Sequence, residues 1–350
     1  MLRAALPGDQ ARGLTGSVAA IPTDDVSRLR ELLEPGANRR YRITITAVKL
    51  DLFSLLSRGP RSAAEVTEHY RGGDRAFEIF LNALTGMGLL EKRGGRFTNT
   101  SFAERFLVRG GKDYRGDQLV VDDADWALWG RLEETLLTGH TPLESSIFVS
   151  DSQIAERLLL GLHHDALEIA PALAARLPLG ECRTLLDLGG GAGTYSVAFC
   201  ARYPRLHATI FDLPSSIRVA GSVVRKSRME ERIRLVEGDF LRDPLPGGYD
   251  AVFMSNVLHG NGPEQNRELF RKVVAVLPAG GLVIVRDVIM DEDLTSPEFG
   301  AVFAVNMLLH SQEGRCYPCR EISEWLEGAG FSQVEVLEPG SLLTARKSNR

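Results

Sequence analysis

Residues 184–193 read Thr-Leu-Leu-Asp-Leu-Gly-Gly-Gly-Ala-Gly, and Thr-Tyr-Ser follows at 194–196. The apolar run 184–188 predicts a buried parallel strand, and the apolar spacing of 195–203 predicts a helix. Between them, Gly189, Gly191 and Gly193 permit a tight turn that a ligand can approach without meeting Cβ atoms. The start of the helix offers unpaired N–H groups and the positive end of its dipole. This stretch therefore predicts a ligand-binding turn at the end of a strand.

The spacing of the glycines separates the candidate ligands. A dinucleotide fingerprint needs its third glycine at position 194, which is threonine here, and no Gly-Lys-Ser/Thr tripeptide indicates a phosphate loop. Asp187, two residues before Gly189, instead suits the ammonium group of S-adenosylmethionine (SAM), which carries no phosphate. Residues 207–211 predict the next strand, and Asp212 at its end is placed to accept from both ribose hydroxyls. We therefore expect SAM to be the cofactor, with Asp187, Gly189, Gly191, Gly193 and Asp212 in its site.

Strands and helices alternate from residue 184 onward, which predicts an α/β fold with a doubly wound, Rossmann-like sheet. We expect further strands at 233–236, 250–256 and 282–285, and two closing strands at 331–337 and 341–345. Asp239 follows the strand at 233–236 and can accept from the adenine amino group, with Phe240 packing on the ring. Ligands of such sheets bind at the carboxyl ends of the strands. The predicted cofactor motifs all fall at that edge.

Composition and charge are those of a globular protein long enough for two domains. The 350 residues are 44% hydrophobic and 25% charged, with a net charge of −5. That charge argues against a nucleic-acid partner, no apolar run approaches the length of a membrane span, and residues 1–20 lack the apolar region of a secretory signal. Four cysteines suit a reducing compartment better than a disulfide scaffold. We expect a cytoplasmic protein without nucleic-acid or membrane partners.

The N-terminal part predicts helices and then a winged helix. Residues 24–58 read as helices at 26–33 and 43–56, with a break at Pro35-Gly36. Ser62 and Glu65 form a capping box before a short helix, residues 74–84 predict a second helix, and 91–98 predict a hairpin. A winged helix can bind DNA, but this second helix has no basic face. We therefore favour a dimerisation role, with a DNA-binding regulator as the alternative.

Four motifs together resemble the small-molecule O-methyltransferases of the plant caffeate and bacterial natural-product type. They lie at 186–193, 211–214 (Phe-Asp-Leu-Pro), 238–240 (Gly-Asp-Phe) and 256–259 (Asn-Val-Leu-His). The resemblance covers nearly the whole chain and implies SAM-dependent methyl transfer by a homodimer to a small aromatic or polyketide-like molecule of secondary metabolism. It implies a dimerisation domain at 1–115, a helical connector at 116–180 that contributes to the substrate pocket, and a methyltransferase domain at 181–350. Leu213, Ser255 and Asn256 join the expected cofactor site.

The resemblance places His259 at the position of the family's catalytic base, in a stretch that reads Leu-His-Asp-Trp in the family. A phenol with a pKa near 10 is a poor nucleophile until a base such as histidine takes its proton. The family's acidic partners of this histidine fall on Asp287, shorter than the usual glutamate, and on Cys316. Gly260-Asn261 replaces the Asp-Trp that usually follows. These departures leave C-methylation, or a SAM-binding relative with altered chemistry, as alternatives to O-methylation.

A larger set of residues is expected at the substrate pocket. A helix predicted at 117–139 carries Trp126 and Trp129, and a helix predicted at 154–177, bent near Pro171, carries His163. These three side chains line the pocket, or else the tryptophans belong to the core and the histidine lies on the surface. The helix predicted at 299–309 and the loop after it add Phe303, Asn306, Met307, His310 and Cys316. Cys316 and Cys319 have no second Cys/His pair for zinc. We therefore predict no metal and assign these cysteines, in a loop before a helix at 321–329, to packing or pocket lining.

Overall fold

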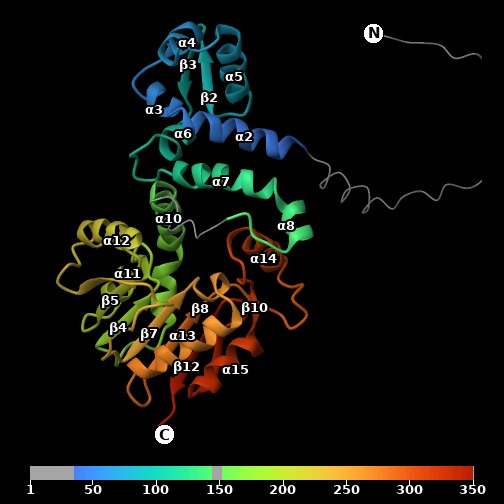
Figure 1. Ribbon diagram of the computed structural model, residues 1–350. Helices are drawn as coiled ribbons and strands as arrows, with labels where there is room; N and C mark the ends of the chain where they lie inside the picture. The colour runs from blue at the N-terminus through green and yellow to red at the C-terminus, as the bar shows by residue number, and fades with distance from the viewer. Residues whose placement is uncertain (1–34, 144–151, 350) are drawn as a thin grey trace, which may run out of the picture.

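The computed structural model describes residues 35–143 and 152–349, so the helix predicted at 26–33 lies outside the described residues. Figure 1 shows a smaller N-terminal region above a larger α/β region, with the C-terminus at the far end. Helix α10 (Ser152–Arg176) enters the α/β region from above and runs through Pro171 as one helix. None of the described helices is long and apolar enough to cross a membrane.

The N-terminal region is a winged helix preceded by two helices. The capping box is confirmed, because Ser62 N donates to Glu65 Oε2 (2.6 Å) and Glu65 N donates to Ser62 Oγ (3.2 Å). Pro35 and Gly36 lie in the first turn of the first described helix, and because the residues before Pro35 lie outside the described part of the chain, the predicted break there stays a prediction. The single helix predicted at 43–56 is wrong, because the chain breaks at Asp51, which has a φ of 55°. The elements are α2 (Pro35–Lys49), α3 (Leu52–Leu56), β1 (Arg61–Ser62), α4 (Ala63–Tyr70), α5 (Asp74–Gly86), β2 (Leu90–Arg93), β3 (Arg96–Asn99) and α6 (Ser101–Phe106).

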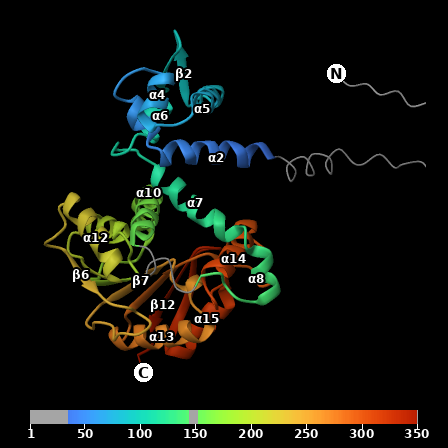
Figure 2. The ribbon, with the colours of Figure 1, turned by 45° about the horizontal axis from the view of Figure 1, so that its top comes forward.

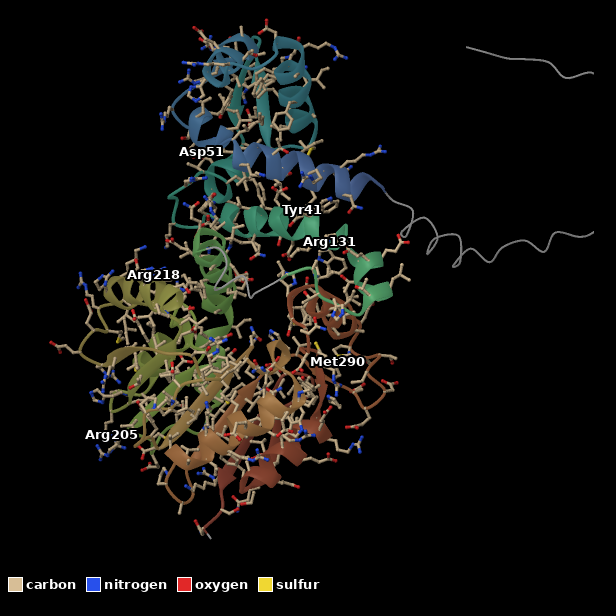
Figure 3. The ribbon with its side chains drawn as sticks, in the orientation of Figure 1. Tyr41, Asp51, Arg131, Arg205, Arg218 and Met290 are labelled. Carbon is tan, nitrogen blue, oxygen red and sulfur yellow. The ribbon has the colours of Figure 1, made fainter. Side chains whose placement is uncertain are left out.

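The single helix predicted at 117–139 is also wrong. The structure has two helices, α7 (Gly116–Trp129) and α8 (Leu132–Thr138), because the helix ends at Gly130, a residue of low helix propensity. Helix α7 packs along α2, and the Tyr41 hydroxyl donates to the Asp122 carboxylate. Figure 3 shows Tyr41 between α2 and α7. In Figure 2, α7 and α8 extend from α2 towards α14 (Glu298–His310).

The larger region contains the predicted doubly wound sheet, whose strands differ from the predicted ranges by a few residues at their ends. Its order is β11-β12-β8-β7-β4-β5-β6, with β4 to β8 parallel and the β11–β12 pair antiparallel at one edge. The strands are β4 (Thr184–Leu188), β5 (His207–Asp212), β6 (Ile233–Glu237), β7 (Ala251–Ser255), β8 (Leu282–Arg286), β11 (Phe331–Glu338) and β12 (Leu342–Lys347). The helices are α11 (Thr194–Arg202), α12 (Pro214–Lys226), α13 (Pro263–Val276) and α15 (Cys319–Ala329).

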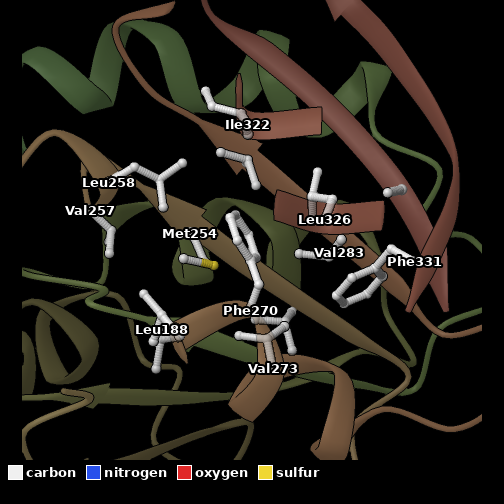
Figure 4. Packing of buried hydrophobic residues seen from close by; sticks show 14 of the residues in the cluster. Leu188, Met254, Val257, Leu258, Phe270, Val273, Val283, Ile322, Leu326 and Phe331 are labelled. Carbon is white, nitrogen blue, oxygen red and sulfur yellow. The ribbon is translucent and has the colours of Figure 1, made fainter. Parts of the chain in front are cut away.

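Alternate residues of each central strand pack against opposite helical layers. Leu186 and Leu188 of β4 belong to a core that includes Phe270 of α13 and Leu326 of α15, shown in Figure 4. Leu185 lies in a second core with residues of α10, α11 and α12. Strand residues alternate in direction, so Asp187 points to the same side as Leu185. This alternation directs the Asp187 carboxylate towards α11.

Candidate active site

The glycine turn after β4 has the backbone that its sequence predicts. Gly189, Gly191 and Gly193 have φ values of 67°, 56° and 77°, in the left-handed region that favours glycine. A Cβ on Gly193 would lie 2.5 Å from Ile210 Cδ1, and one on Gly189 would lie 2.9 Å from Val257 Cγ2 and 3.4 Å from Phe240 Cε1. Backbone conformation and lack of space therefore both require glycine at the turn.

Two buried carboxylates flank the turn. Asp187 accepts from Ser196 Oγ (2.6 Å), and burial, with the nearby Asp212, raises its pKa to about 7 although the Ser196 bond opposes this. Asp212 accepts from Gly191 N (2.8 Å) and Leu213 N (2.6 Å), and burial raises its pKa against these bonds. Buried carboxylates gain from a cationic ligand. The two carboxylates therefore fit a ligand that carries a positive charge and hydroxyl groups, as SAM does.

The other predicted cofactor residues follow neighbouring strands at the same edge. Asp239 caps the loop after β6 by accepting from Leu241 N (2.9 Å), and partly buried Phe240 borders the glycine turn. At the end of β7, Ser255 Oγ accepts from Arg286 Nη1 (3.3 Å) and Asn256 has a φ of 57°. The predicted grouping at one edge of the sheet is therefore present.

His259 lies in the short helix η1 (Leu258–Gly260) after β7 and pairs with Asp287 at the end of β8. Its Nδ1 is 2.6 Å from Asp287 Oδ1, and the two side chains are 14% and 3% exposed. Asp287 Oδ2 also accepts from Val257 N (3.0 Å) and Leu258 N (2.9 Å). Burial raises the pKa of Asp287, but the imidazole and the backbone N–H groups outweigh it and hold that pKa below its ordinary value. An ionised Asp287 fixes the proton on Nδ1 and leaves Nε2 able to accept one.

Side chains of Asn261, Asn266 and Tyr317 hold the loop of His259 in place. Asn261 Nδ2 donates to Val257 O (3.1 Å), and Asn266 Nδ2, from α13, donates to Leu258 O (3.0 Å). The Tyr317 hydroxyl donates to Asn261 O. Figure 4 shows Val257 and Leu258 packed into the core beneath. The Gly260-Asn261 departure from the family pattern thus gives a buried amide that braces the loop, and its partner Asn266 was not recognisable before the fold was known.

Cys316 cannot act as a second acid beside His259. Burial, with the charge of Asp287, raises the pKa of its thiol to about 11, so the thiol stays neutral. The predicted loop is wrong here: Tyr317–Pro318 forms strand β10, paired with β9 (Ile289–Met290), and Cys319 begins α15. Redox-active cysteines have a lowered pKa, so the raised value of Cys316 supports a packing role. In the described part of the chain, no group of His, Cys, Asp and Glu could hold a metal.

Helix α14 brings part of the predicted substrate pocket to His259. The Phe303 ring meets the His259 ring edge-on, with centroids 5.0 Å apart at 86°. One turn later Met307 is buried, while the Asn306 carbonyl accepts from His310, which also pairs with Asp125 of α7. The face of α14 from Phe303 to His310 therefore joins His259 to the connector helices.

The tryptophans and His163 lie elsewhere. Trp126 and Trp129 are 43% and 37% exposed, so the core alternative is wrong for both, and Trp126 lies under Arg42 of α2 (5.7 Å).

His163 is not a surface histidine: its Nδ1 bonds Thr194 Oγ1 (2.7 Å) behind the glycine turn, and burial lowers its pKa to about 4. It also lines a cavity of about 560 Å³ between α10, α12 and the loop before α7. Thr194 and Ser196 were missed, although both directly follow the predicted turn.

Two family descriptions match the chain. An O-methyltransferase domain covers residues 146–332, and an O-methyltransferase dimerisation domain covers residues 42–109. The second match falls on the winged helix and supports the dimerisation interpretation over the DNA-binding alternative. The first supports O-methylation over the C-methylation alternative.

Individual proteins agree with these matches. The chain is 34% identical to 3-hydroxy-5-methyl-1-naphthoate 3-O-methyltransferase of Streptomyces sahachiroi, over 84% of this chain and 87% of that one. It is 33% identical to the tetracenomycin polyketide synthesis 8-O-methyl transferase TcmO of Streptomyces glaucescens, over 87% and 93%. The solved structure of PigF with SAH superimposes with a TM-score of 0.81 at 25% identity, over 93% of this chain and all (100%) of that one. At this identity and coverage, the chain belongs to the SAM-dependent O-methyltransferases that act on small natural-product or aromatic molecules.

Proposed function

We propose that the enzyme methylates a hydroxyl group on an aromatic, polyketide-type acceptor, with His259 as the general base. The His259–Asp287 pair carries this proposal, because Asp287 binds Nδ1 and leaves Nε2 to take the hydroxyl proton. SAM supplies an electrophilic methyl group on a sulfonium. The acceptor oxygen uses a lone pair to form the new C–O bond as the C–S bond breaks, and the electron pair of the C–S bond goes to sulfur. The proton on Nε2 later passes to solvent.

The acceptor class rests on the pocket and on the relatives. The Phe303 ring beside His259 offers an aromatic molecule an edge or a face to pack against. The relatives described above act, by their names, on a naphthoate and in tetracenomycin polyketide synthesis. Both observations favour a fused, hydroxylated aromatic ring system as the acceptor.

Isotope-labelled SAM tests the proposed function. With methyl-labelled SAM and a panel of hydroxylated naphthoates and polyketide aromatics, we expect label in a methyl ether, one SAH per label, and no label in matched substrates whose hydroxyl groups are already methylated. Label bound to carbon in the product would contradict the proposal, and so would the absence of transfer to every hydroxylated member of the panel.

We expect Asp212→Ala to weaken SAM binding by about tenfold or more, the ~1.4 kcal/mol of lost charge-assisted hydrogen bonds to the ribose. Asp212 also holds Gly191 N, so the turn loses a support as well. Titration calorimetry measures the affinity. Glu230→Ala, which removes an exposed carboxylate away from the predicted site, serves as the control. Equal SAM affinity in the two variants would remove Asp212 from the site.

SAM affinity should also depend on pH through Asp187. In the free protein burial raises the pKa of this carboxyl to about 7, so it is protonated below that pH. The SAM ammonium favours the ionised form, so binding must release a proton, and each pH unit below 7 should weaken binding by up to about tenfold. Calorimetry in buffers of different ionisation enthalpy should show this release at pH 6 and its loss at pH 8. Affinity independent of pH would contradict a contact between Asp187 and the ammonium.

We also propose that the working enzyme is a homodimer, on the strength of the matched dimerisation domain. Light scattering at micromolar concentration should then give about twice the 38.4 kDa of one chain. A mass of one chain would contradict the proposal.

A further inference from the structure

His310, the last residue of α14, is bonded at both ring nitrogens. Its Nδ1 is 2.9 Å from Asn306 O, and its Nε2 is 2.9 Å from Asp125 Oδ1. A carbonyl oxygen only accepts, so Nδ1 must carry a hydrogen, and an ionised carboxylate likewise requires one on Nε2. The two bonds together therefore describe an imidazolium. Burial lowers the pKa of His310, but Asp125 and the Asn306 carbonyl outweigh it and raise that pKa overall.

The surroundings of His310 favour a charged ring. Asp125 faces it from α7, with the two side chains 16% and 24% exposed. The ring also lies at the C-terminus of α14, where the helix dipole stabilises a cation. Helix α8 and the turn after it approach this end of α14 through Gly139 and Thr141, which carry no titratable group. His140 between them is exposed, and Asp125 is the charged group that acts on the His310 ring. Asp125 is therefore the titratable partner that decides whether His310 keeps its second proton.

This bond joins two parts of the active-site region. On the α7 side, Asp122 accepts from Tyr41 and Asp123 pairs with Arg42, so α7 is itself fixed to α2. On the α14 side, Phe303 lies two turns before His310 and packs on His259. The connector therefore runs from the N-terminal region to the helix that contacts the proposed base.

Three further hydrogen bonds fasten the connector at the same place. Thr141 Oγ1 donates to Leu309 O (2.8 Å), Gln312 Nε2 donates to Gly139 O (3.1 Å), and Thr141 N donates to Gln312 Oε1 (3.4 Å). In Figures 1 and 2, α8 lies beside α14. The end of α14 is thus held to α7 and to the turn after α8, and the His310–Asp125 bond is the contact among these that involves charge.

We propose that His310 and Asp125 are positioning residues for methyl transfer: their ionic hydrogen bond holds the connector α7–α8 against α14, keeps Phe303 in place beside His259, and loosens when His310 loses its proton. The link to catalysis rests on the function proposed above. Because the pKa of His310 is raised in the folded protein, the bond is complete below the ordinary histidine pKa and is lost as the pH rises through the raised value.

Nitrogen-15 NMR of the histidine rings tests the charge state without any substrate. We expect His310 to be more than half protonated at pH 6.5, with both ring nitrogens carrying hydrogen. Asp125→Ala should lower the midpoint of its titration by about one pH unit, the effect of losing one favourable charge. Glu133→Ala, which removes an exposed carboxylate from α8, should leave the midpoint unchanged. A neutral ring at pH 6.5, or equal midpoints in the two variants, would overturn the proposal.

Asp125→Asn separates charge from hydrogen bonding. Its amide can donate to Nε2 of a neutral ring, so the contact survives without titrating. Amide hydrogen exchange across residues 116–138 should therefore be faster in Asp125→Ala than in Glu133→Ala, and close to wild type in Asp125→Asn. Equal exchange in Asp125→Ala and Glu133→Ala would show that the pair holds nothing in place.

The kinetic consequence is measured on the acceptor found by labelled methyl transfer. Asp125→Ala should raise the acceptor KM by about tenfold with little change in SAM affinity. The wild-type KM should rise as the pH passes the His310 midpoint, whereas that of Asp125→Asn should not. If no acceptor is methylated, the proposed function fails, but the NMR and exchange results still show whether the His310–Asp125 bond holds the connector against α14. A pH-independent wild-type KM would overturn the positioning role.

Discussion

His259→Gln should lower kcat by about 10² or more while leaving SAM affinity and the fold intact. Glutamine can still hydrogen-bond, but its amide cannot take a proton from the acceptor hydroxyl. Single-turnover methyl transfer measures the chemical step, and calorimetry measures SAM binding. The buried carboxylates at the glycine turn are separate from His259 in the structure. The rate of the chemical step should therefore fall while the SAM affinity stays at its wild-type value. His207→Gln, at the exposed start of β5, is the matched control and should retain the wild-type rate.

The size of this effect reports on the acceptor. A variant that keeps most of the wild-type rate would remove His259 from the mechanism, and alignment alone would then account for catalysis, as expected for a carbon nucleophile or an acceptor that is already ionised. The resemblance to the family implies two acidic partners for the histidine, but here Cys316 is a buried neutral thiol and only Asp287 is charged. We therefore expect a loss nearer 10² than the upper end of general-base effects, about 10⁴.

The glycine turn and the sheet could be predicted because their signals are local. The spacing of Asp187 and the three glycines fixes a strand, a turn and a helix within a few residues, and parallel strands carry each following acidic residue to one edge. The same reasoning failed at Asp51 and at Gly130, because single helices were predicted at 43–56 and 117–139 and the structure interrupts each of them. Apolar spacing continues across both positions and does not reveal where a helix ends.

The contacts that position the site could not be predicted, because they join distant segments. His310 and Asp125 are 185 residues apart in the sequence, and His163 and Thr194 are 31 apart. Each histidine was recognised as a candidate for the pocket by its residue type, but its partner depends on how α7 packs on α14 and how α10 packs on α11. Asn261 illustrates the same point, since it was noticed as a departure from the family pattern while its bracing role required Asn266 of α13.

Asp287→Ala should cost about 3 kcal/mol of unfolding free energy and lower the rate of methyl transfer as well. The carboxylate is 3% exposed and accepts from His259 Nδ1 and from the backbone N–H groups of Val257 and Leu258, so its loss leaves buried donors without a partner. Denaturant unfolding measures the free energy, and single-turnover kinetics measure the rate. Asp291→Ala, an exposed carboxylate a few residues later, should change neither. Equal unfolding free energies for the two alanine variants would contradict the structural role.

Asp287→Asn then separates support of the loop from orientation of the base. Its amide oxygen can still accept from one or both backbone N–H groups, so most of the stability should return. Its amide nitrogen, however, can donate to Nδ1 and favour the tautomer with hydrogen on Nε2, which cannot accept the substrate proton. We therefore expect Asp287→Asn to lose rate with little loss of stability, Asp287→Ala to lose both, and His259→Gln to lose rate alone. If Asp287→Asn kept the wild-type rate, Asp287 would serve the fold of the loop and not the tautomer of His259.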